Sequence, residues 1–319
     1  MLEVNTIIST VNDHLSSSTD RTKGYNLSEL TDIAAASIIN QLTFVGLFQD
    51  VRENFFELRE AIEQAFKDFM HPAIIMIIAF PWLRYFPIFS HFFKRAEKND
   101  ETMDNFFSKN INDTIQRQTK EKQAGDKIFT MKALKGLCVD LFIAGQDTTS
   151  NTLRFLVLYM MLFPETQAKM QQELDEVLGD KKMARKGNAA LLQPCSLNLI
   201  HRTTKDVVCG GYKIAKGTRI VPMISTVLYD QKFMPERFIE NGQLKKCEEL
   251  IPFSIGKRQC VGESLARMEL FLFTANFFYL FKIRTVDPSN PPSLHKNAGL
   301  TVSPVDYKCI IEKRKQNLV

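Results

Sequence analysis

The sequence lacks the cysteine patterns that mark a metal site or a disulfide framework. It contains six cysteines, but no CxxC pair and no Cys/His spacing of a zinc site. Scattered cysteines are typical of reduced thiols, so we expect a protein that faces the cytosol. Asp13, Asp20 and Arg21 interrupt the first apolar stretch. We therefore expect no signal peptide.

Long hydrophobic runs are also missing, and no stretch is long and apolar enough to predict a membrane-spanning helix. The nearest is Ala73–Leu83, which Pro81 interrupts and Arg84 follows. Aromatic residues continue from there to Phe93. Two interpretations of Ala73–Phe93 stay open: a peripheral contact with a membrane interface, or a buried helix end and loop.

Charge of one sign is not in large excess, because 41 Lys+Arg face 36 Asp+Glu, a formal net charge of +5. This balance is too weak to predict nucleic-acid binding. A basic face that docks an acidic protein and a merely solvated surface both stay open. With 45% hydrophobic and 24% charged residues, the composition is that of an ordinary globular protein.

Helical periodicity covers most of the first two thirds of the chain. We expect helices near 26–42, 51–69 and 106–122, with prolines breaking the chain at Pro72, Pro81 and Pro87. A long central helix is predicted at about 131–163, with Thr130 as its N-cap, and a further helix at 164–178. Short strands are predicted at 207–209, 212–214 and 218–224, then a helix at 260–281 and a β-rich tail. The fold class is therefore mainly α with a small β subdomain.

The most specific motif is the segment from Phe253 to Gly262. It fits the pattern F-x-x-G-x-R-x-C-x-G at each fixed position, namely Phe253, Gly256, Arg258, Cys260 and Gly262. Chance would produce this pattern in on the order of one chain in ten thousand. The segment resembles the haem-binding loop of the cytochrome P450 family.

This resemblance implies a role for each fixed residue of the loop. Cys260 would be the thiolate ligand of the iron in haem b. The iron and the N-terminus of the following helix would both favour the deprotonated sulfur. Arg258 would pair with a haem propionate, and Phe253 would shield the sulfur. Gly256 and Gly262 would let the backbone turn tightly and approach the porphyrin.

A second motif lies inside the predicted central helix, where Gly, Asp and Thr are locally unfavourable. The run from Ala144 through Thr148 resembles the family's A-G-x-D-T oxygen-activation segment. The resemblance implies that Ala144 and Gly145 let dioxygen and haem approach the helix. Thr148 would hydrogen-bond the bound oxygen, and Asp147 would relay protons to it.

Weaker resemblances support the same family. His201 matches the segment after the family's K helix, which implies that it faces a haem propionate. Pro235–Phe238 resembles the meander motif, and Phe80–Arg84 resembles animal microsomal members.

The sequence also departs from the family pattern. It contains no E-x-x-R, and 180–198 stands where that helix is expected. The family's W-x-x-x-R is not matched, because Phe86 stands four residues after Trp82. The segment from Tyr229 to Phe233 runs into Pro235 sooner than the family pattern has it, as though a short segment were cut out. We therefore expect residues 1–319 to form a partial, N-terminally truncated cytochrome P450 domain, which is an incomplete version of that fold. In the family, the E-x-x-R helix forms a buried ion network with the arginine of the meander motif. Because that network has lost a partner here, we expect the chain to fold poorly or to hold haem weakly.

The resemblance implies a microsomal haem-thiolate monooxygenase that inserts one oxygen atom into a lipophilic substrate. NADPH-cytochrome P450 reductase would supply electrons, docking near Lys257, Arg258 and Arg267, and cytochrome b5 is a further expected partner. Two alternatives stay open: a non-catalytic fragment, and a haem-binding protein without monooxygenase activity. The expected location is the cytosolic face of the endoplasmic reticulum membrane, or the cytoplasm if no anchor is present.

Overall fold

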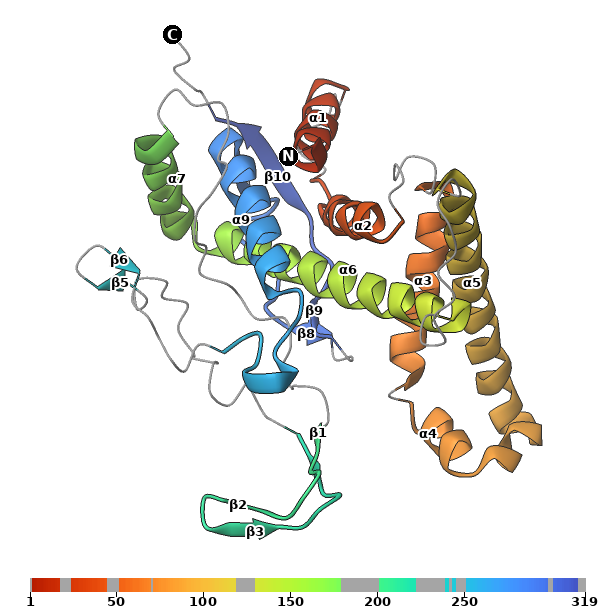
Figure 1. Ribbon diagram of the computed structural model, residues 1–319. Helices are drawn as coiled ribbons and strands as arrows, with labels where there is room; N and C mark the ends of the chain where they lie inside the picture. Colours follow the sequence, from red (N-terminus) through yellow and green to blue (C-terminus); the bar gives the residue numbers. More distant parts are fainter. Residues whose placement is uncertain are drawn as a thin grey trace.

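The computed structural model describes residues 2–17, 24–44, 52–69, 71–118, 130–178, 201–221, 239–240, 243–244, 251–297 and 301–314. Helices dominate this part of the chain, and one long helix, α6 (Met131–Leu162), crosses the whole molecule (Figure 1). The remaining helices are α1 (Leu2–Ser17), α2 (Ser28–Phe44), α3 (Arg52–Phe69), α4 (Pro72–Ala79), the 3-10 helix η2 (Pro81–Tyr85), α5 (Pro87–Gln118), α7 (Pro164–Leu178), the 3-10 helix η4 (Gly256–Arg258) and α9 (Glu263–Leu280). The prediction of a mainly α protein is confirmed.

The central helix α6 begins and ends close to the predicted residues. Thr130 has an extended backbone, and its side chain accepts a hydrogen bond from the amide of Ala133 at 3.1 Å, as an N-cap does. At the other end the helix stops at Leu162, and Pro164 starts α7. The prediction of a helix at 131–163 is therefore confirmed to within one residue.

Prolines divide the segment between α3 and α5 as predicted. Pro72, Pro81 and Pro87 each stand at the first residue of a helix, where the missing amide hydrogen costs nothing. The sequence does not anticipate how far the last of these helices runs. α5 is 32 residues long, so the helix predicted at 106–122 forms only its C-terminal part, as far as Gln118.

The strands of the described residues form separate antiparallel pairs. They are β1 (His201–Arg202) with β4 (Arg219–Ile220), β2 (Val207–Cys209) with β3 (Tyr212–Ile214), β5 (Ile239–Glu240) with β6 (Gln243–Leu244), β7 (Phe281–Thr285) with β10 (Cys309–Lys313), and β8 (Lys296–Asn297) with β9 (Ser303–Pro304). Gly210 and Gly211 join β2 to β3 with φ of 56° and 83°, which glycine adopts without strain. This predicted hairpin is confirmed.

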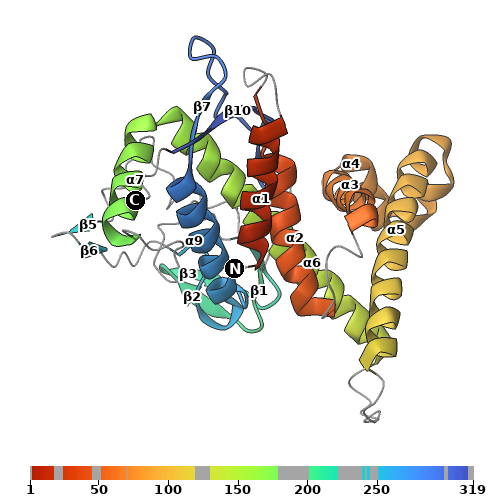
Figure 2. The same ribbon diagram turned by 90° about the horizontal axis from the view of Figure 1, so that it is seen from above.

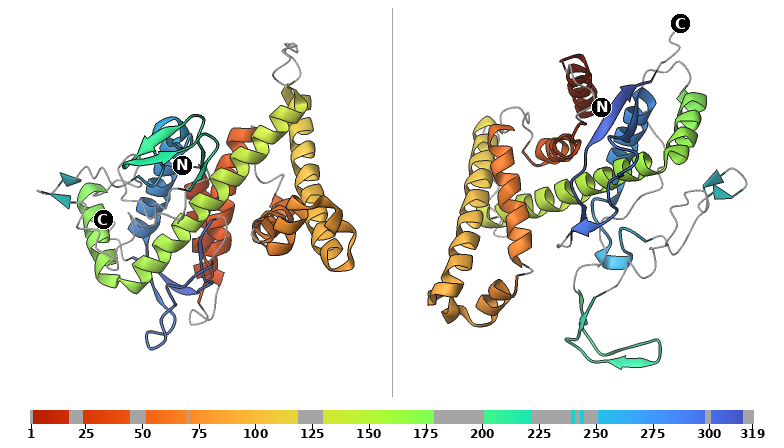
Figure 3. Two further views of the ribbon diagram at one scale, coloured as in Figure 1. Left: turned by 90° about the horizontal axis from the view of Figure 1, so that it is seen from below. Right: turned by 180° about the vertical axis from the view of Figure 1, so that it is seen from behind.

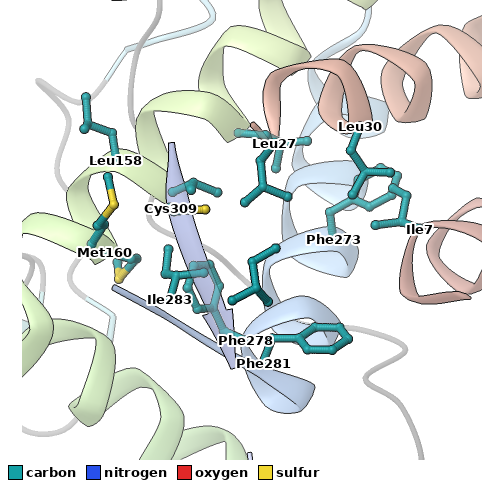
Figure 4. Close-up of a cluster of buried hydrophobic side chains, with 14 of the residues drawn as sticks. Ile7, Leu27, Leu30, Leu158, Met160, Phe273, Phe278, Phe281, Ile283 and Cys309 are labelled. Atoms are coloured by element: carbon teal, nitrogen blue, oxygen red, sulfur yellow. The ribbon is translucent and has the colours of Figure 1, made fainter. Parts of the chain in front are cut away.

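The larger hydrophobic core lies where α1, α2, α6 and α9 meet the β7–β10 pair (Figure 4). Figure 2 shows α1 and α2 side by side across α6, with α9 next to α1. Phe278, Phe281 and Ile283 are almost completely buried in this core. Burying side chains of this size contributes about 1.5–3 kcal/mol each, so this core fixes the end of α9 and the strand β7 relative to α6.

A second core joins the other end of α6, together with α2, to α3 and α5, which lie to one side of the molecule (Figure 3). Phe107 and Phe142 are fully buried there, with ring centroids 5.6 Å apart in an edge-to-face arrangement. α6 therefore contributes to both cores and links the two parts of the molecule.

Candidate active site

The cysteine loop closes on itself immediately before α9. The amide of Cys260 donates to the carbonyl oxygen of Phe253 at 2.9 Å, and the amide of Gln259 donates to the carbonyl oxygen of Gly256 at 3.1 Å. Gly256 has a φ of 74°, so the turn requires glycine there, as predicted. Ser254 also has a positive φ, of 62°, an unusual conformation for a residue with a side chain.

Cys260 is exposed and lies three residues before the first residue of α9. Gly262 follows it with a φ of −88°, so this turn does not require glycine. A Cβ added at Gly262 would lie 3.9 Å from the sulfur of Cys260, which is ordinary van der Waals contact. The φ of Gly262 therefore does not by itself require a glycine, and its predicted role in a tight turn that approaches a porphyrin stays a prediction.

Side chains of α9 brace the loop from outside. The guanidinium of Arg267 stacks over the ring of Phe253 at 5.0 Å, and its Nε donates to Glu263 Oε1 at 2.8 Å. Gln259 Nε2 donates to the other oxygen of Glu263 at 2.5 Å. The sequence did not suggest this bracing, because Arg267 stood out only as a surface cation. Its partner four residues earlier, Glu263, is the detectable signal.

The alcohol of the second motif lies on an open stripe of α6. Leu134, Leu137, Leu141, Ala144 and Thr148 recur at helical spacing, and the leucines and Ala144 are exposed. Leu137 is 55% exposed and Leu141 is 41% exposed, which is unusual for large apolar side chains in a central helix. The hydroxyl of Thr148 donates to the carbonyl oxygen of Ala144 at 2.7 Å, so its oxygen can still accept a hydrogen bond.

The acid of the motif points elsewhere. Asp147 is about 100° around the helix from Thr148, and its carboxylate accepts a hydrogen bond from the hydroxyl of Thr301. Burial raises the pKa of Asp147, while the bond from Thr301 and the charge of Arg154 lower it. The structure thus gives the two predicted catalytic residues different surroundings.

Gly145 faces α2 across the contact between α2 and α6. A Cβ built there would lie 2.4 Å from Cδ1 of Ile39, a distance at which the side chain must move. The small size of Gly145 therefore allows these two helices to pack closely. The access to dioxygen predicted for it stays a prediction.

The sequence reasoning missed a buried acid opposite the motif. Glu269 on α9 is 4% exposed, and its Oε1 has no hydrogen-bond partner within the described part of the chain. Burial raises its pKa to about 7, although Thr149 of α6 donates to it and lowers the value. Only its place in an otherwise apolar helical run could have singled it out.

His201 and Arg258, the remaining predicted residues, lie on the same side of α6 as each other. His201 starts β1, is half-buried and pairs with Ile220 of β4. Both β1 and the loop that carries η4 lie on one side of α6 (Figures 1 and 3). Arg258 is exposed at the end of η4. Pro235–Phe238, Tyr229–Phe233 and 180–198 lie outside the described residues, as do Cys195 and Cys247.

Comparison with known proteins decides between a chance loop and a family motif. A model of the family described as Cytochrome P450 matches residues 2–311 of this chain. The chain belongs to the cytochrome P450 family. The sequence-based recognition of an animal microsomal type is confirmed by the relatives.

Mammalian members of the cytochrome P450 family resemble the chain over most of its length. Cytochrome P450 2C3 of Oryctolagus cuniculus is 34% identical over 315 residues, which cover 86% of this chain and 64% of that protein. Cytochrome P450 2U1 of Homo sapiens is 30% identical over 320 residues, or 88% of this chain and 58% of that protein. Cytochrome P450 2E1 of Sus scrofa is 31% identical over 313 residues, or 87% and 61%. The chain thus spans about three fifths of the length of these relatives.

The described residues fit the haem that the cytochrome P450 family implies. Cys260 presents an exposed thiol, and one thiol suffices because a porphyrin supplies four ligands of its own. The leucine stripe of α6 is an uncovered apolar face of the kind that a porphyrin or an apolar molecule buries. Arg258 is exposed and available to a propionate.

No described helix of this cytochrome P450 is long and apolar enough to cross a membrane.

Proposed function

We propose that the chain is a haem-thiolate monooxygenase that inserts one atom of dioxygen into a lipophilic organic substrate. The observation that carries the proposal is the exposed Cys260 in a loop closed by the bond from its amide to Phe253. When bound, a thiolate-ligated haem supplies oxygen activation, because the thiolate donates electron density that favours O–O cleavage. We propose haem b as the form of the cofactor.

The chain's own residues would bind, orient and protect this chemistry. Cys260 would hold the iron, and Arg258 and His201 would each face a propionate. Phe253, held under Arg267, would keep water from the sulfur. Thr148 would accept a hydrogen bond at the open stripe, and Asp147 would move protons towards it. The exposed leucines of that stripe favour an apolar substrate.

A flavoprotein reductase that uses NADPH would supply the electrons, with cytochrome b5 as a second donor. Lys257, Arg258 and Arg267 are exposed around the cysteine loop, where an acidic partner would approach. We place the protein at the cytosolic face of the endoplasmic reticulum, as the family resemblance implies.

The exposed apolar side chains of α4, η2 and the start of α5 support a peripheral membrane contact. We define the apolar patch as Ile75, Met76, Ile78, Phe80, Trp82, Tyr85, Phe86 and Ile88, all of which are exposed. A contiguous run of this kind is typical of a surface that lies in a membrane interface.

The carbon monoxide spectrum of the reduced protein tests the proposed function. Expressed with a haem supply, the chain should show a Soret band at the far-red position of thiolate-ligated haem. Cys260→Ser should abolish the band. Cys209→Ser, which removes an exposed thiol on β2, should leave it unchanged. A band of nitrogen-ligated haem, or no haem, would contradict the proposal.

Activity separates the remaining alternatives. With full haem and a competent reductase, product should form, and Thr148→Ala should lower the product formed per oxygen consumed. Full haem without product would favour a haem-binding protein without monooxygenase activity, whereas loss of haem would favour a non-catalytic fragment.

A further inference from the structure

The C-terminal segment before β10 is fastened to α6 over two turns of that helix. The hydroxyl of Thr301 donates to the carboxylate of Asp147. Asp306 accepts a hydrogen bond from Arg154 Nη2 at 2.8 Å, and the hydroxyl of Tyr307 donates to the carbonyl oxygen of Arg154 at 2.5 Å. The first of these contacts reaches the acid of the oxygen-activation motif.

Several charged groups surround Asp147, but they differ in how they act. Arg154 on α6 and Arg59 on α3 favour its ionised form, whereas Glu63 on α3 disfavours it. Asp32 on α2 carries a further charge that interacts with Asp147. These groups act through space. Thr301, by contrast, supplies a direct hydrogen bond, which both orients the carboxylate and stabilises its negative charge.

Thr301 contacts the one residue of the motif, Asp147, that is proposed to relay protons. Thr301 lies 154 residues after Asp147, so the pairing depends on the fold and not on local sequence. A carboxylate that serves as a proton relay needs a fixed direction and an ionised state that can accept a proton. A valine in place of Thr301 would keep the shape of the side chain and remove the donor.

We propose that Thr301 is a positioning residue that orients the carboxylate of Asp147, the residue before Thr148, and holds it as a proton acceptor. This inference rests on the proposed function and names the residue that controls its proton supply. Thr301 acts only through Asp147. Asp306 and Tyr307, by contrast, hold the same segment on α6 through Arg154 and do not contact Asp147 in the described structure.

Infrared titration of the carboxyl group tests this role without requiring haem. The band of Asp147 is isolated by subtracting the spectrum of Asp147→Asn. Thr301→Val should raise the titration midpoint of that band by about one pH unit, since a hydrogen bond to a charged group is lost. Thr301→Ser keeps the hydroxyl and should restore the parent midpoint. If Thr301→Val does not fold, Thr301→Ala provides the same test.

Asp306→Asn is the matched control, because it weakens another contact of the same segment with α6. It should lower stability but leave the midpoint of Asp147 unchanged or slightly lower, since Arg154 becomes freer to act on that carboxylate. A midpoint that Thr301→Val does not move would overturn the inference, even in a haem-loaded protein. An absent Soret band would instead overturn the proposed function, and the titration would still decide the role of Thr301.

Discussion

At the residue scale, three carboxyl groups on or next to α6 are removed from water, and each comes from a different helix. Asp32 lies on α2, Asp147 on α6 and Glu269 on α9, and burial is the largest cause of a raised pKa in all three. Partners compensate unequally. Asp32 has an ion pair with Arg59 at 2.7 Å, whereas no positive charge among the described residues lowers the pKa of Glu269. Of the three acids, Glu269 is thus the one whose pKa is lowered only by a neutral hydrogen-bond donor, Thr149.

Glu269 should make the stability of the chain depend on pH. Its pKa is about 7 in the folded chain and 4.5 as an unperturbed group. Between these values the unfolded chain releases the proton first, so the folded state binds more protons and stability falls as pH rises. The loss should reach about 3 kcal/mol by pH 8. Glu269→Gln should remove this contribution, as measured by urea unfolding at pH 5 and pH 8.

The exposed Glu312 provides a control for the same measurement. It forms a surface ion pair with Arg284 at 2.6 Å, so Glu312→Gln should change stability by about 0–1 kcal/mol at either pH. If the unfolding free energies of the parent and of Glu269→Gln changed equally between pH 5 and pH 8, Glu269 would not titrate between these pH values.

At the scale of the elements, close packing of α2 on α6 depends on one missing side chain. Gly145→Ala would place a Cβ 2.4 Å from Cδ1 of the buried Ile39. We expect overpacking to cost about 1–3 kcal/mol of unfolding free energy, measured with urea. Ile39→Ala removes the clashing atoms, so the cost of Gly145→Ala should largely disappear in that background.

The same pair of variants separates packing from the predicted role of Gly145 in oxygen access. If Gly145 serves packing alone, Ile39→Ala should also restore haem content to the Gly145→Ala variant. A cost that is equal in both backgrounds would show that the contact with Ile39 is not the cause.

Element boundaries could be predicted where a local rule sets them, and not where tertiary contacts do. Thr130 and the prolines at 72, 81, 87 and 164 mark helix starts through capping and the missing amide hydrogen. The full length of α5 was missed, because its polar sequence shows little periodicity before Phe106 and the packing against α3 sustains it. The helix predicted from Cys260 begins instead at Glu263, since the bond from the Cys260 amide to Phe253 closes the loop first.

A second element-scale contact was beyond prediction because it joins distant segments through a side chain. Gln167 on α7 accepts from the amide of Ile283 and donates to the carbonyl oxygens of Met160 and Ile283, each at 2.9 Å. This buried side chain thereby attaches β7 to α7. Gln167→Ala should cost about 2–4 kcal/mol, because it leaves backbone groups unpaired in the core. Gln172→Ala, on the exposed face of α7, should change urea unfolding by less than about 0.5 kcal/mol.

At the scale of the whole molecule, the sequence suggests the parts of the proposed site but not how they are arranged relative to one another. The cysteine loop and the Ala144–Thr148 segment carry fixed residues at fixed spacing, so a chemistry could be proposed for them from the sequence alone. The partners that adjust that chemistry could not, since Thr301 and Glu269 approach α6 only in the folded chain. Local spacing records which residues share a turn, but not which segments pack together.

The last prediction concerns how the whole molecule meets a membrane. The apolar patch lies on α4, η2 and the start of α5, on elements separate from the hairpin of β2 and β3, which also lies at the lower end of the molecule in Figure 1. Ile78 and Trp82 are 65% and 57% exposed, so neither supports the fold by burial. Ile78→Glu with Trp82→Glu should weaken binding to phosphatidylcholine vesicles at least roughly tenfold, since large apolar side chains lose their burial in lipid. Flotation of the protein with vesicles measures this.

Val208 on β2 provides the comparison, because it is 69% exposed but lies outside the patch. Val208→Glu with Tyr212→Glu adds the same two charges, so a general effect of negative charge would weaken vesicle binding equally in both variants. Weakening confined to the patch variant would locate the contact on α4 and η2. If both double variants bound vesicles equally weakly, the apolar patch would have no special role in membrane binding. The lipophilic substrate would then have to reach the stripe of α6 from water.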